Sequence, residues 1–313
     1  MAATLIAIMG PTACGKTALA SALCQRLDTP VISVDSAMVY RAMDIGTAKP
    51  TRDELAAAPH RLIDLVDPGE VYSAGQFRRD ALAEIERVHS RGRPALLAGG
   101  TMLYFRALLN GIDPLPSADA SLRARLDAEA ADLGWPALHR RLAEVDPAAA
   151  ERIHVNDAQR IQRALEVHAL SGRPISEWQT RAATPLPGRV VRVALIPGDR
   201  AALHARIEAR FDLMLDSGFI EEVAGLLSRY DLDTNTPCLR AVGYRQIAAH
   251  LRGELSFDQA REDAITATRR LARRQLTWLR RESDVERVDP DRNDPIPEVL
   301  RRLDASGVAV HPL

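Results

Sequence analysis

Residues Thr4 to Thr17 have the sequence TLIAIMGPTACGKT, in which an apolar run leads directly into a glycine-bearing loop. The run Thr4–Met9 predicts a buried strand, and Ala18–Leu27 predicts the helix that follows the loop. Between them, Gly10–Thr17 match the phosphate-loop pattern G-x-x-x-x-G-K-S/T. Strand, loop and helix in this order predict a P-loop α/β fold that binds a phosphate compound.

The chemistry of this loop follows from its residue types. Glycine lets the backbone curl so that successive amides point at an anion, and the N-terminus of the next helix adds partial positive charge. Lys16 is expected to reach the outer phosphate, and the hydroxyl of Thr17 to bind Mg²⁺. The alternative is a glycine turn that binds nothing. The predicted phosphate-binding residues are Gly10, Pro11, Thr12, Ala13, Cys14, Gly15, Lys16 and Thr17.

Further apolar runs extend the strand and helix alternation along the chain. They are Val31–Val34, Leu62–Val66, Ala95–Ala98 and Val190–Ile196, with helical segments between most of them. One of these helices begins with a capping box formed by Ser73 and Gln76. This alternation predicts a mostly parallel sheet with helices on both faces.

The segment between Pro116 and Pro187 contains no strand candidate. It predicts three helices, at 122–133, 136–145 and 157–170. We therefore expect residues 1–116 and 188–313 to form the P-loop core, and residues 117–187 to form an all-helical insertion or lid. After Ile196 the sequence predicts only helices to the end of the chain.

The overall charge argues against a uniformly basic nucleic-acid binder, because the net charge is −1. Local patches can still be basic. Of the 41 Lys and Arg residues only Lys16 and Lys49 are lysine. Chance could leave two lysines, or these two positions have no room for the larger, planar guanidinium group of arginine.

Nothing in the sequence indicates export or insertion into a membrane. No apolar segment approaches the roughly 20 residues of a membrane span, and we expect no signal peptide. The three cysteines, Cys14, Cys24 and Cys238, have neither metal-ligand spacing nor a disulfide pattern. These features predict a cytoplasmic protein with reduced thiols, and nothing demands more than a monomer.

Two further polar positions follow predicted strands. Asp35 and Ser36 come directly after Val31–Val34, and Thr101 follows Gly99 and Gly100. Because parallel strands end at one edge of the sheet, these groups should lie near the phosphate loop. Asp35 is then a base or an orienting group, or else it caps a turn or lies behind a magnesium ion. Thr101 marks a second anion site, or only caps a helix.

Several strings, in order along nearly the whole chain, resemble the bacterial tRNA dimethylallyltransferases, also called isopentenyl transferases. They are GPTACGKT at 10–17, DSAMVYRAMDIGTAKP at 35–50, PHRLIDLVDP at 59–68, AGGTMLYFRALLNG at 98–111, QRIQRALEV at 159–167, AVGYRQ at 241–246 and RRLARRQLTWLR at 269–280. Cys14 departs from the serine usual in that family. No cysteine follows Cys238, so the zinc finger of the eukaryotic relatives is not expected.

The resemblance implies a specific reaction. The donor is dimethylallyl diphosphate, with Mg²⁺ as the ion. The exocyclic amine of the adenosine just 3′ of the anticodon attacks the allylic carbon, and diphosphate leaves. By the same resemblance Asp35 takes the proton from the amine, and Thr101 and Arg123 stabilise the charge on the departing diphosphate.

Binding of the tRNA anticodon stem-loop is expected from four groups of residues. The last group lies on a predicted helix, 263–281, with an apolar stripe on one face and arginines on another, although a solvated charged face has the same pattern. Tyr244, Arg245 and Gln246 are candidates for reading splayed-out bases. The residues are Asp35, Ser36, Ala37 and Met38; Gln159, Arg160, Ile161, Gln162 and Arg163; Arg240, Ala241, Val242, Gly243, Tyr244 and Arg245; and Arg270, Arg273, Arg274 and Trp278.

Two other functions remain open from the residues alone. A small-molecule kinase of the nucleotide or shikimate type shares the P-loop and the parallel sheet, and would transfer a phosphoryl group from ATP. An RNA-binding protein with a regulatory or vestigial phosphate site would bind without forming product. Neither accounts for the strings at 35–50 and 98–111 together.

Overall fold

The structure, a computed structural model, describes residues 4–113, 115–178, 186, 188–234, 236–292 and 294–308. The chain forms two compact units. The first combines Met1–Leu109 with Pro187–Leu313, and the second is Asn110–Leu186. Each unit is described by itself.

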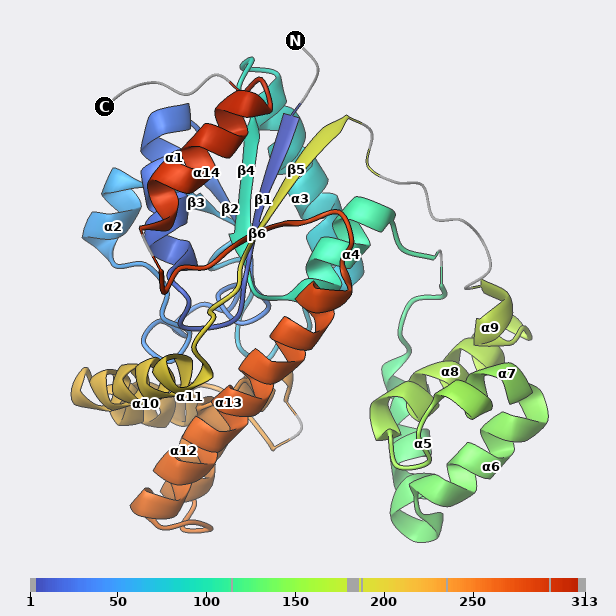
Figure 1. The fold of residues 1–313 in the computed structure, drawn as a ribbon. Helices are drawn as coiled ribbons and strands as arrows, with labels where there is room; N and C mark the ends of the chain where they lie inside the picture. The colour runs from blue at the N-terminus through green and yellow to red at the C-terminus, as the bar shows by residue number, and fades with distance from the viewer. Residues whose placement is uncertain are drawn as a thin grey trace. The chain divides into compact units, whose positions relative to one another are not determined.

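The first unit is built on a parallel sheet of six strands (Figure 1). The order in the sheet is β3-β2-β4-β1-β5-β6, and every described pairing is parallel. Because both faces of such a sheet are covered, its central strands are continuous apolar runs, and Leu5–Met9 are at most 2% exposed. The strands are β1 (Thr4–Met9), β2 (Val31–Val34), β3 (His60–Arg61), β4 (Ala95–Gly99), β5 (Arg189–Leu195) and β6 (Glu286–Val288).

Helices cover both faces of this sheet and surround its carboxyl edge. Helices α1 and α14 share one core with the sheet, and α3 lies on the opposite face (Figure 1). Helices α10 to α13 form a second core with residues 39–43. The helices are α1 (Lys16–Leu27), α2 (Arg52–Ala57), α3 (Ala74–His89), α4 (Met102–Asn110), α10 (Arg200–Asp216), α11 (Phe219–Arg229), the 3-10 helix η1 (Pro237–Arg240), α12 (Tyr244–Leu251), α13 (Phe257–Arg281) and α14 (Pro295–Ala305).

The second unit is entirely helical over the residues described. Its apolar core brings together Leu126, Leu142 and Ile161 from three helices. The buried carboxylate of Glu166 lies in this unit. The helices are α5 (Ala120–Leu133), α6 (Trp135–Val145), α7 (Pro147–Arg152), α8 (Ala158–Ser171) and α9 (Ile175–Trp178).

The predicted fold class, a parallel α/β sheet flanked by helices with a helical subdomain, is confirmed. The predicted capping box is also present, with Ser73 accepting from the Gln76 amide and Gln76 accepting from the Ser73 amide. Over the described residues, no helix is both long and apolar enough to cross a membrane.

Two strand predictions were wrong. Leu62–Val66 is not a strand, because Leu62 and Asp64 have left-handed φ angles of 63° and 55° that interrupt an extended backbone. The strand at this place is His60–Arg61. The segment after Ile196 is not only helical, since β6 adds a strand beside β5. That strand is only three residues long and carries two charged residues, so its apolar pattern is too short to see.

Candidate functional site

A cavity of about 750 Å³ lies where three neighbouring strands end, and every residue that lines it belongs to the first unit. The loops after β1, β2 and β4 contribute Lys16, Asp35 and Thr101. Helices α10 and α13 contribute further polar lining, including Arg210 and Arg274. Three strand ends therefore bring these predicted site residues to one place, as expected for an open α/β sheet.

The phosphate loop has the backbone shape that exposes amides. Ala13 and Gly15 have left-handed φ angles of 59° and 85°. Within the described part of the chain, the N–H groups of Cys14 and Gly15 donate no hydrogen bond, and no side chain caps the N-terminus of α1. These unpaired donors at a helix N-terminus are suited to an anion. A Cβ at Gly10 would lie 2.7 Å from the Cys14 Sγ, so the turn requires glycine there.

The side chains of the loop add a cation and a free hydroxyl. The Lys16 Nζ donates to the Pro11 carbonyl at 2.5 Å and lies 3.8 Å from the Cys14 Sγ, so it folds back over its own loop. Thr17 is exposed on the cavity lining, and its hydroxyl has no hydrogen-bond partner among the described residues. Both residues line the cavity.

Asp35 both caps a turn and faces the cavity. Its Oδ1 accepts from the amides of Ala37 at 2.8 Å and Met38 at 3.3 Å. The described residues offer no hydrogen bond to its Oδ2. The turn therefore fixes one oxygen of the carboxylate and leaves the other available to a substrate.

Thr101 connects the ends of β4 and β2. Its Oγ1 accepts from the Ser36 amide at 3.1 Å and lies 3.3 Å from the Ser36 Oγ, while its own amide donates to the Val34 carbonyl. The hydroxyl thus contacts the loop after β2, next to Asp35. Thr101 also occupies the N-cap position of α4, since its carbonyl accepts from the Tyr104 and Phe105 amides, but among the described residues its hydroxyl accepts no hydrogen bond from that helix.

Arg210 is a cavity residue that the sequence analysis missed. It lies on α10, three residues after the buried Ile207, so it occupies the inward face of an amphipathic helix. Burial lowers the pKa of its guanidinium, against the opposing influence of Asp35 and Cys14. It makes no hydrogen bond or ion pair within the described residues. An arginine at a core-facing helix position was the signal that could have identified it.

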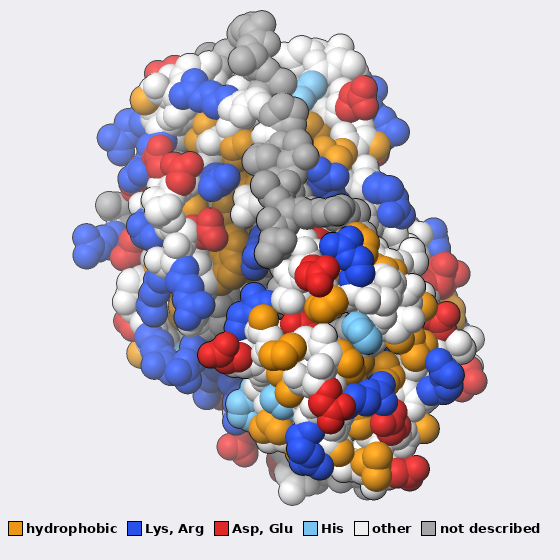
Figure 2. Space-filling model, turned by 90° about the vertical axis from the view of Figure 1, so that its right-hand side faces the viewer, with side chains coloured by type: hydrophobic (Ala, Val, Ile, Leu, Met, Phe, Trp, Pro, Cys, Tyr) orange, Lys and Arg blue, Asp and Glu red, His pale blue; other side chains and the backbone are white. Residues whose placement is uncertain are grey.

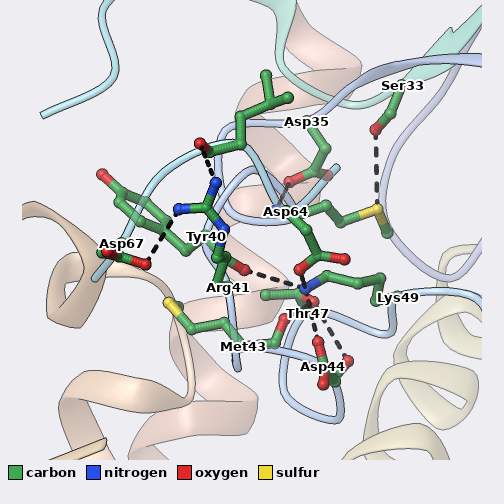
Figure 3. A network of polar contacts seen from close by, with 12 residues as sticks. Ser33, Asp35, Tyr40, Arg41, Met43, Asp44, Thr47, Lys49, Asp64 and Asp67 are labelled. Carbon is green, nitrogen blue, oxygen red and sulfur yellow. Dashed lines mark hydrogen bonds and ion pairs between the residues drawn. The ribbon is translucent and has the colours of Figure 1, made fainter. Parts of the chain in front are cut away.

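Lys49, the second lysine, lies in a network of polar contacts with the 40–50 loop and Asp64 (Figure 3). Its side chain is 4% exposed, and its Nζ lies 2.6 Å from both Asp44 Oδ1 and Asp64 Oδ1. It also donates to the Tyr40 carbonyl at 3.0 Å. Three acceptors surround one compact ammonium group, so Lys49 fixes the 40–50 loop and does not reach a ligand. Tyr40, whose carbonyl accepts from Lys49, is itself buried, and this burial raises the pKa of its hydroxyl to about 12.

Tyr244 does not fit the predicted role of stacking on a base. Its side chain has no accessible surface, and its hydroxyl donates to Glu222 Oε1 at 2.5 Å. The Glu222 carboxylate also accepts from the amides of Asp44, Ile45 and Gly46. Burial, and then the charge of Glu222, raise the pKa of Tyr244. This tyrosine therefore fastens the 44–46 loop to helices α11 and α12.

Helix α13 presents a basic face beside the cavity. Arg270, Arg273 and Arg274 are exposed and form no ion pair with the described residues, and Arg274 and Trp278 line the cavity. The helix begins at Phe257, six residues before the predicted start, because Ser256 and Gln259 form a capping box. Figure 2 shows that basic side chains are gathered unevenly over the face that it draws.

Arg123 and the residues predicted on 159–163 belong to the second unit. Arg123 donates to Glu166 at 2.8 and 2.9 Å, and Arg163 donates to the same carboxylate at 2.5 Å. Burial raises the pKa of Glu166, but the hydrogen bonds from these arginines outweigh it and hold the pKa below its ordinary value. Ile161 is fully buried in the core, so it cannot contact tRNA directly. Arg160 is exposed, 3.5 Å from Asp157.

The cavity thus collects part of the predicted site residues. Those on its lining are Thr12, Ala13, Lys16, Thr17, Asp35, Ser36, Ala37, Met38, Thr101, Arg240, Ala241, Val242, Tyr244, Arg274 and Trp278. Gly10, Pro11, Cys14, Gly15, Gly243, Arg245, Arg270 and Arg273 lie in the same unit but do not line it.

Comparison with known proteins identifies the family. The sequence model of the family described as IPP transferase matches residues 38–282. The chain belongs to the IPP transferase family. It is 56% identical over 302 residues to a tRNA dimethylallyltransferase of Thioalkalivibrio sulfidiphilus, covering 96% of this chain and 94% of that one. A tRNA dimethylallyltransferase of Nitrosococcus oceani is 55% identical over 298 residues, 95% of each chain.

Solved IPP transferase structures share the fold. The tRNA isopentenylpyrophosphate transferase of Bacillus halodurans has a TM-score of 0.71 at 36% identity, covering 98% of this chain and 96% of that one. A eukaryotic dimethylallyltransferase acting on tRNA has a TM-score of 0.82 at 24% identity, covering 99% of this chain and 81% of that one, which is a likeness of fold. The resemblance found in the sequence is therefore confirmed.

Proposed function

We propose that this chain transfers a dimethylallyl group from dimethylallyl diphosphate to the exocyclic amine of the adenosine 3′-adjacent to the anticodon in tRNA, and releases diphosphate. The observation that carries the proposal is the sharing of one cavity by a phosphate loop, a carboxylate and a basic helix face. Lys16, Asp35 and Arg274 all line it. Family membership and the names of the relatives support the same reaction.

The donor's diphosphate would lie on the phosphate loop. The amides of Cys14 and Gly15, the Lys16 ammonium and the Arg210 guanidinium are the positive groups that face this end of the cavity or border it. They neutralise the negative charge that develops on the leaving oxygen. This electrostatic stabilisation is expected to supply the largest share of the catalysis in such a reaction. Arg210 suits this role because it is largely desolvated and forms no hydrogen bond or ion pair with the described residues.

The Thr17 hydroxyl fits a magnesium ion that arrives with the diphosphate. Magnesium is held by few protein oxygens and completes its coordination with phosphate and water. When bound, it would share the charge of the diphosphate oxygens. The protein ligand that we propose for this ion is the neutral hydroxyl oxygen of Thr17, which is exposed.

The acceptor amine would approach Asp35. The new C–N bond forms as the allylic C–O bond breaks, and that electron pair leaves with the diphosphate. Positive charge on nitrogen makes the amine acidic, and the free Oδ2 of Asp35 takes the proton. The Ala37 and Met38 amides hold the other oxygen in place. Thr101 lies beside this loop through Ser36 and can contact the leaving group or the base.

The anticodon stem-loop would bind along α13 and its neighbours. Arg270, Arg273 and Arg274 are exposed and form no ion pair with the part of the chain that the structure describes, and Arg240 and Arg245 are exposed on η1 and α12. Trp278 is partly exposed on the cavity lining and provides an aromatic face. The target adenosine must leave the loop stack to enter the cavity, as in other enzymes that modify bases. On the second unit, Arg160 is proposed to contact tRNA, and Arg123 keeps the role that the resemblance implies, stabilising charge on the departing diphosphate.

The proposal is tested by incubating the protein with labelled dimethylallyl diphosphate, magnesium and an anticodon stem-loop. Label on the one adenosine 3′ of the anticodon is the expected result. A stem-loop with guanosine at that position should stay unlabelled. Consumption of ATP with no use of the prenyl donor would instead indicate the kinase alternative, and tight binding of RNA without product the binding-protein alternative.

A further inference from the structure

Gln275 is buried on a helix whose other polar side chains are mostly exposed. It is 8% exposed, and it lies on the same face of α13 as Ala272 and Leu279, three residues before and four after. A buried side-chain amide needs hydrogen-bond partners. Its Oε1 accepts from the Thr12 amide at 3.0 Å, and its Nε2 donates to the Gly100 carbonyl at 2.9 Å.

These two partners belong to the two loops that face the donor's diphosphate in the proposed reaction. The pairing of β1 with β4 ends at Met9 and Gly99. Just beyond that pair, the Gln275 amide connects the phosphate loop to the residue before Thr101. The fit is close, because a Cβ at Gly100 would lie 2.5 Å from the Gln275 Nε2. The amide also occupies the Thr12 N–H, so that donor is directed to the helix and not into the cavity.

We infer that Gln275 is a positioning residue that keeps the phosphate loop and the Gly100–Thr101 loop in the arrangement that binds diphosphate. The inference rests on the proposed function. A neutral amide suits this place because it both accepts and donates. A carboxylate could accept from Thr12 but not donate to Gly100, and it would bring negative charge toward the diphosphate. Since Arg274 precedes it, one helix carries both the basic face and the support of the phosphate site.

The test measures binding of inorganic diphosphate, with magnesium present, by calorimetry. Gln275→Leu keeps much of the side-chain volume but leaves the Thr12 N–H and the Gly100 carbonyl unpaired. We expect the dissociation constant for diphosphate to rise about tenfold, because each unpaired buried group is costly. The kcat/KM for the prenyl donor should fall by a similar factor, while the dissociation constant for the anticodon stem-loop stays unchanged. Gln275→Glu should bind diphosphate more weakly still.

Two controls separate positioning from a general loss of structure. Ile265→Val changes a buried residue earlier on the same helix, and it should leave diphosphate binding unchanged. Gly100→Ala disrupts the same contact from the loop side and should also weaken diphosphate binding. It tests the inference independently if Gln275→Leu fails to fold. The effects of Gly100→Ala and Gln275→Leu should not add in the double variant, since both disrupt one contact.

The outcomes distinguish this inference from the proposed function. If the unaltered protein does not bind diphosphate, both are overturned. If it binds and Lys16→Ala weakens binding, while Gln275→Leu and Gly100→Ala bind normally, the phosphate site stands and the role of Gln275 is overturned. Equal losses of diphosphate and stem-loop affinity in Gln275→Leu would also overturn it, because a disordered α13 gives that result.

Discussion

The guanidinium of Arg123 and the fully buried carboxylate of Glu166 form a two-point ion pair, with N–O distances of 2.8 and 2.9 Å. Arg163 donates to the same carboxylate. Besides its proposed role at the diphosphate, Arg123 therefore has a structural role inside the second unit, where it pairs with Glu166. Loss of Arg123 removes a partner from a buried charge, whatever else it does.

We expect Arg123→Ala to lower the free energy of unfolding by about 2 kcal/mol, since a buried charge loses one of two charged partners. The folded state holds the pKa of Glu166 below its ordinary value of 4.5. The Glu166 carboxylate therefore contributes fully to the free energy of unfolding above its ordinary pKa, and this contribution is lost as the pH falls through the lower, folded-state pKa. Denaturant unfolding of the unaltered protein at pH 7 and at pH 3 should show that this contribution is lost at the lower pH. Glu166→Gln should lack that part of the pH dependence, and an unchanged acid profile would contradict the assignment.

The catalytic role of Arg123 needs a test that tolerates this loss of stability. Turnover should be measured at low temperature, with circular dichroism showing that the variant is folded. We expect a reduced rate at saturating donor and tRNA. A folded Arg123→Ala variant with normal turnover would leave Arg123 with only its structural partner, Glu166.

Lys49→Arg should destabilise the protein although it preserves charge. Lys49 is 4% exposed and has three oxygen atoms around one nitrogen, an arrangement that a planar guanidinium cannot reproduce. We expect a cost of about 2 kcal/mol, measured as a lower denaturant midpoint. Arg41→Lys is a matched control, because the Arg41–Asp67 pair is half exposed and its change should cost less than about 0.5 kcal/mol. Equal stability of both variants would show that the lysine is retained by chance.

Lys16→Ala should weaken binding of the prenyl donor and of diphosphate by about ten- to a hundredfold, the usual worth of a charge-assisted contact. The fold should stay intact, because the hydrogen bonds that the Lys16 Nζ makes to described residues all lie within its own loop. Calorimetric titration with diphosphate and magnesium measures the effect. Arg26→Ala, in the last turn of the same helix, should bind normally. Unchanged donor affinity in folded Lys16→Ala would falsify the phosphate-loop assignment.

The sequence predicted the parts of the site whose signals are local. The phosphate loop is contiguous, and Asp35 and Thr101 each follow a strand, so the rule that parallel strands end together placed them at one edge. Arg210 could not be placed this way, because its approach to the loop depends on how α10 packs. Gln275 was likewise hidden among the arginines of α13, where only the tertiary structure shows which side chain turns inward.

The errors in the sequence analysis have the same origin. Tyr244 was assigned to tRNA because an aromatic ring beside Arg245 can stack on bases, but its ring completes a core with Phe219, centroids 4.9 Å apart. Ile161 lies within a basic string yet faces the helical core. Leu62–Val66 is an apolar run, but its backbone hydrogen-bonds to the 38–41 loop and turns left-handed at Leu62 and Asp64. In each case tertiary packing, not local preference, decided the outcome.

Asp35→Asn should leave both substrates bound and slow the chemical step. The asparagine oxygen can still accept from the Ala37 and Met38 amides, so the turn is preserved while the basicity is lost. A general base typically contributes a factor of about a hundred to ten thousand, and the single-turnover rate should fall within that range. Rapid-quench measurements at saturating donor and stem-loop provide the rate. If it were unaltered, Asp35 would be no more than the cap of its turn.

The basic face of α13 makes a prediction about salt. Arg270 and Arg274 are exposed and pair with no carboxylate among the residues described, so removing their charge should not disturb the fold. Contacts with phosphates give affinity without sequence choice, because they release counterions from the nucleic acid. Arg270→Gln with Arg274→Gln should therefore weaken all tRNAs about equally. Each lost contact should reduce the slope of log affinity against log salt by about 0.7 to 0.9. A double change of Arg261 and Arg269, which are paired with Glu208, is the matched control and should leave the slope unchanged. A wild-type slope in the Arg270 and Arg274 double variant would mean that this face is only solvated and that tRNA docks elsewhere.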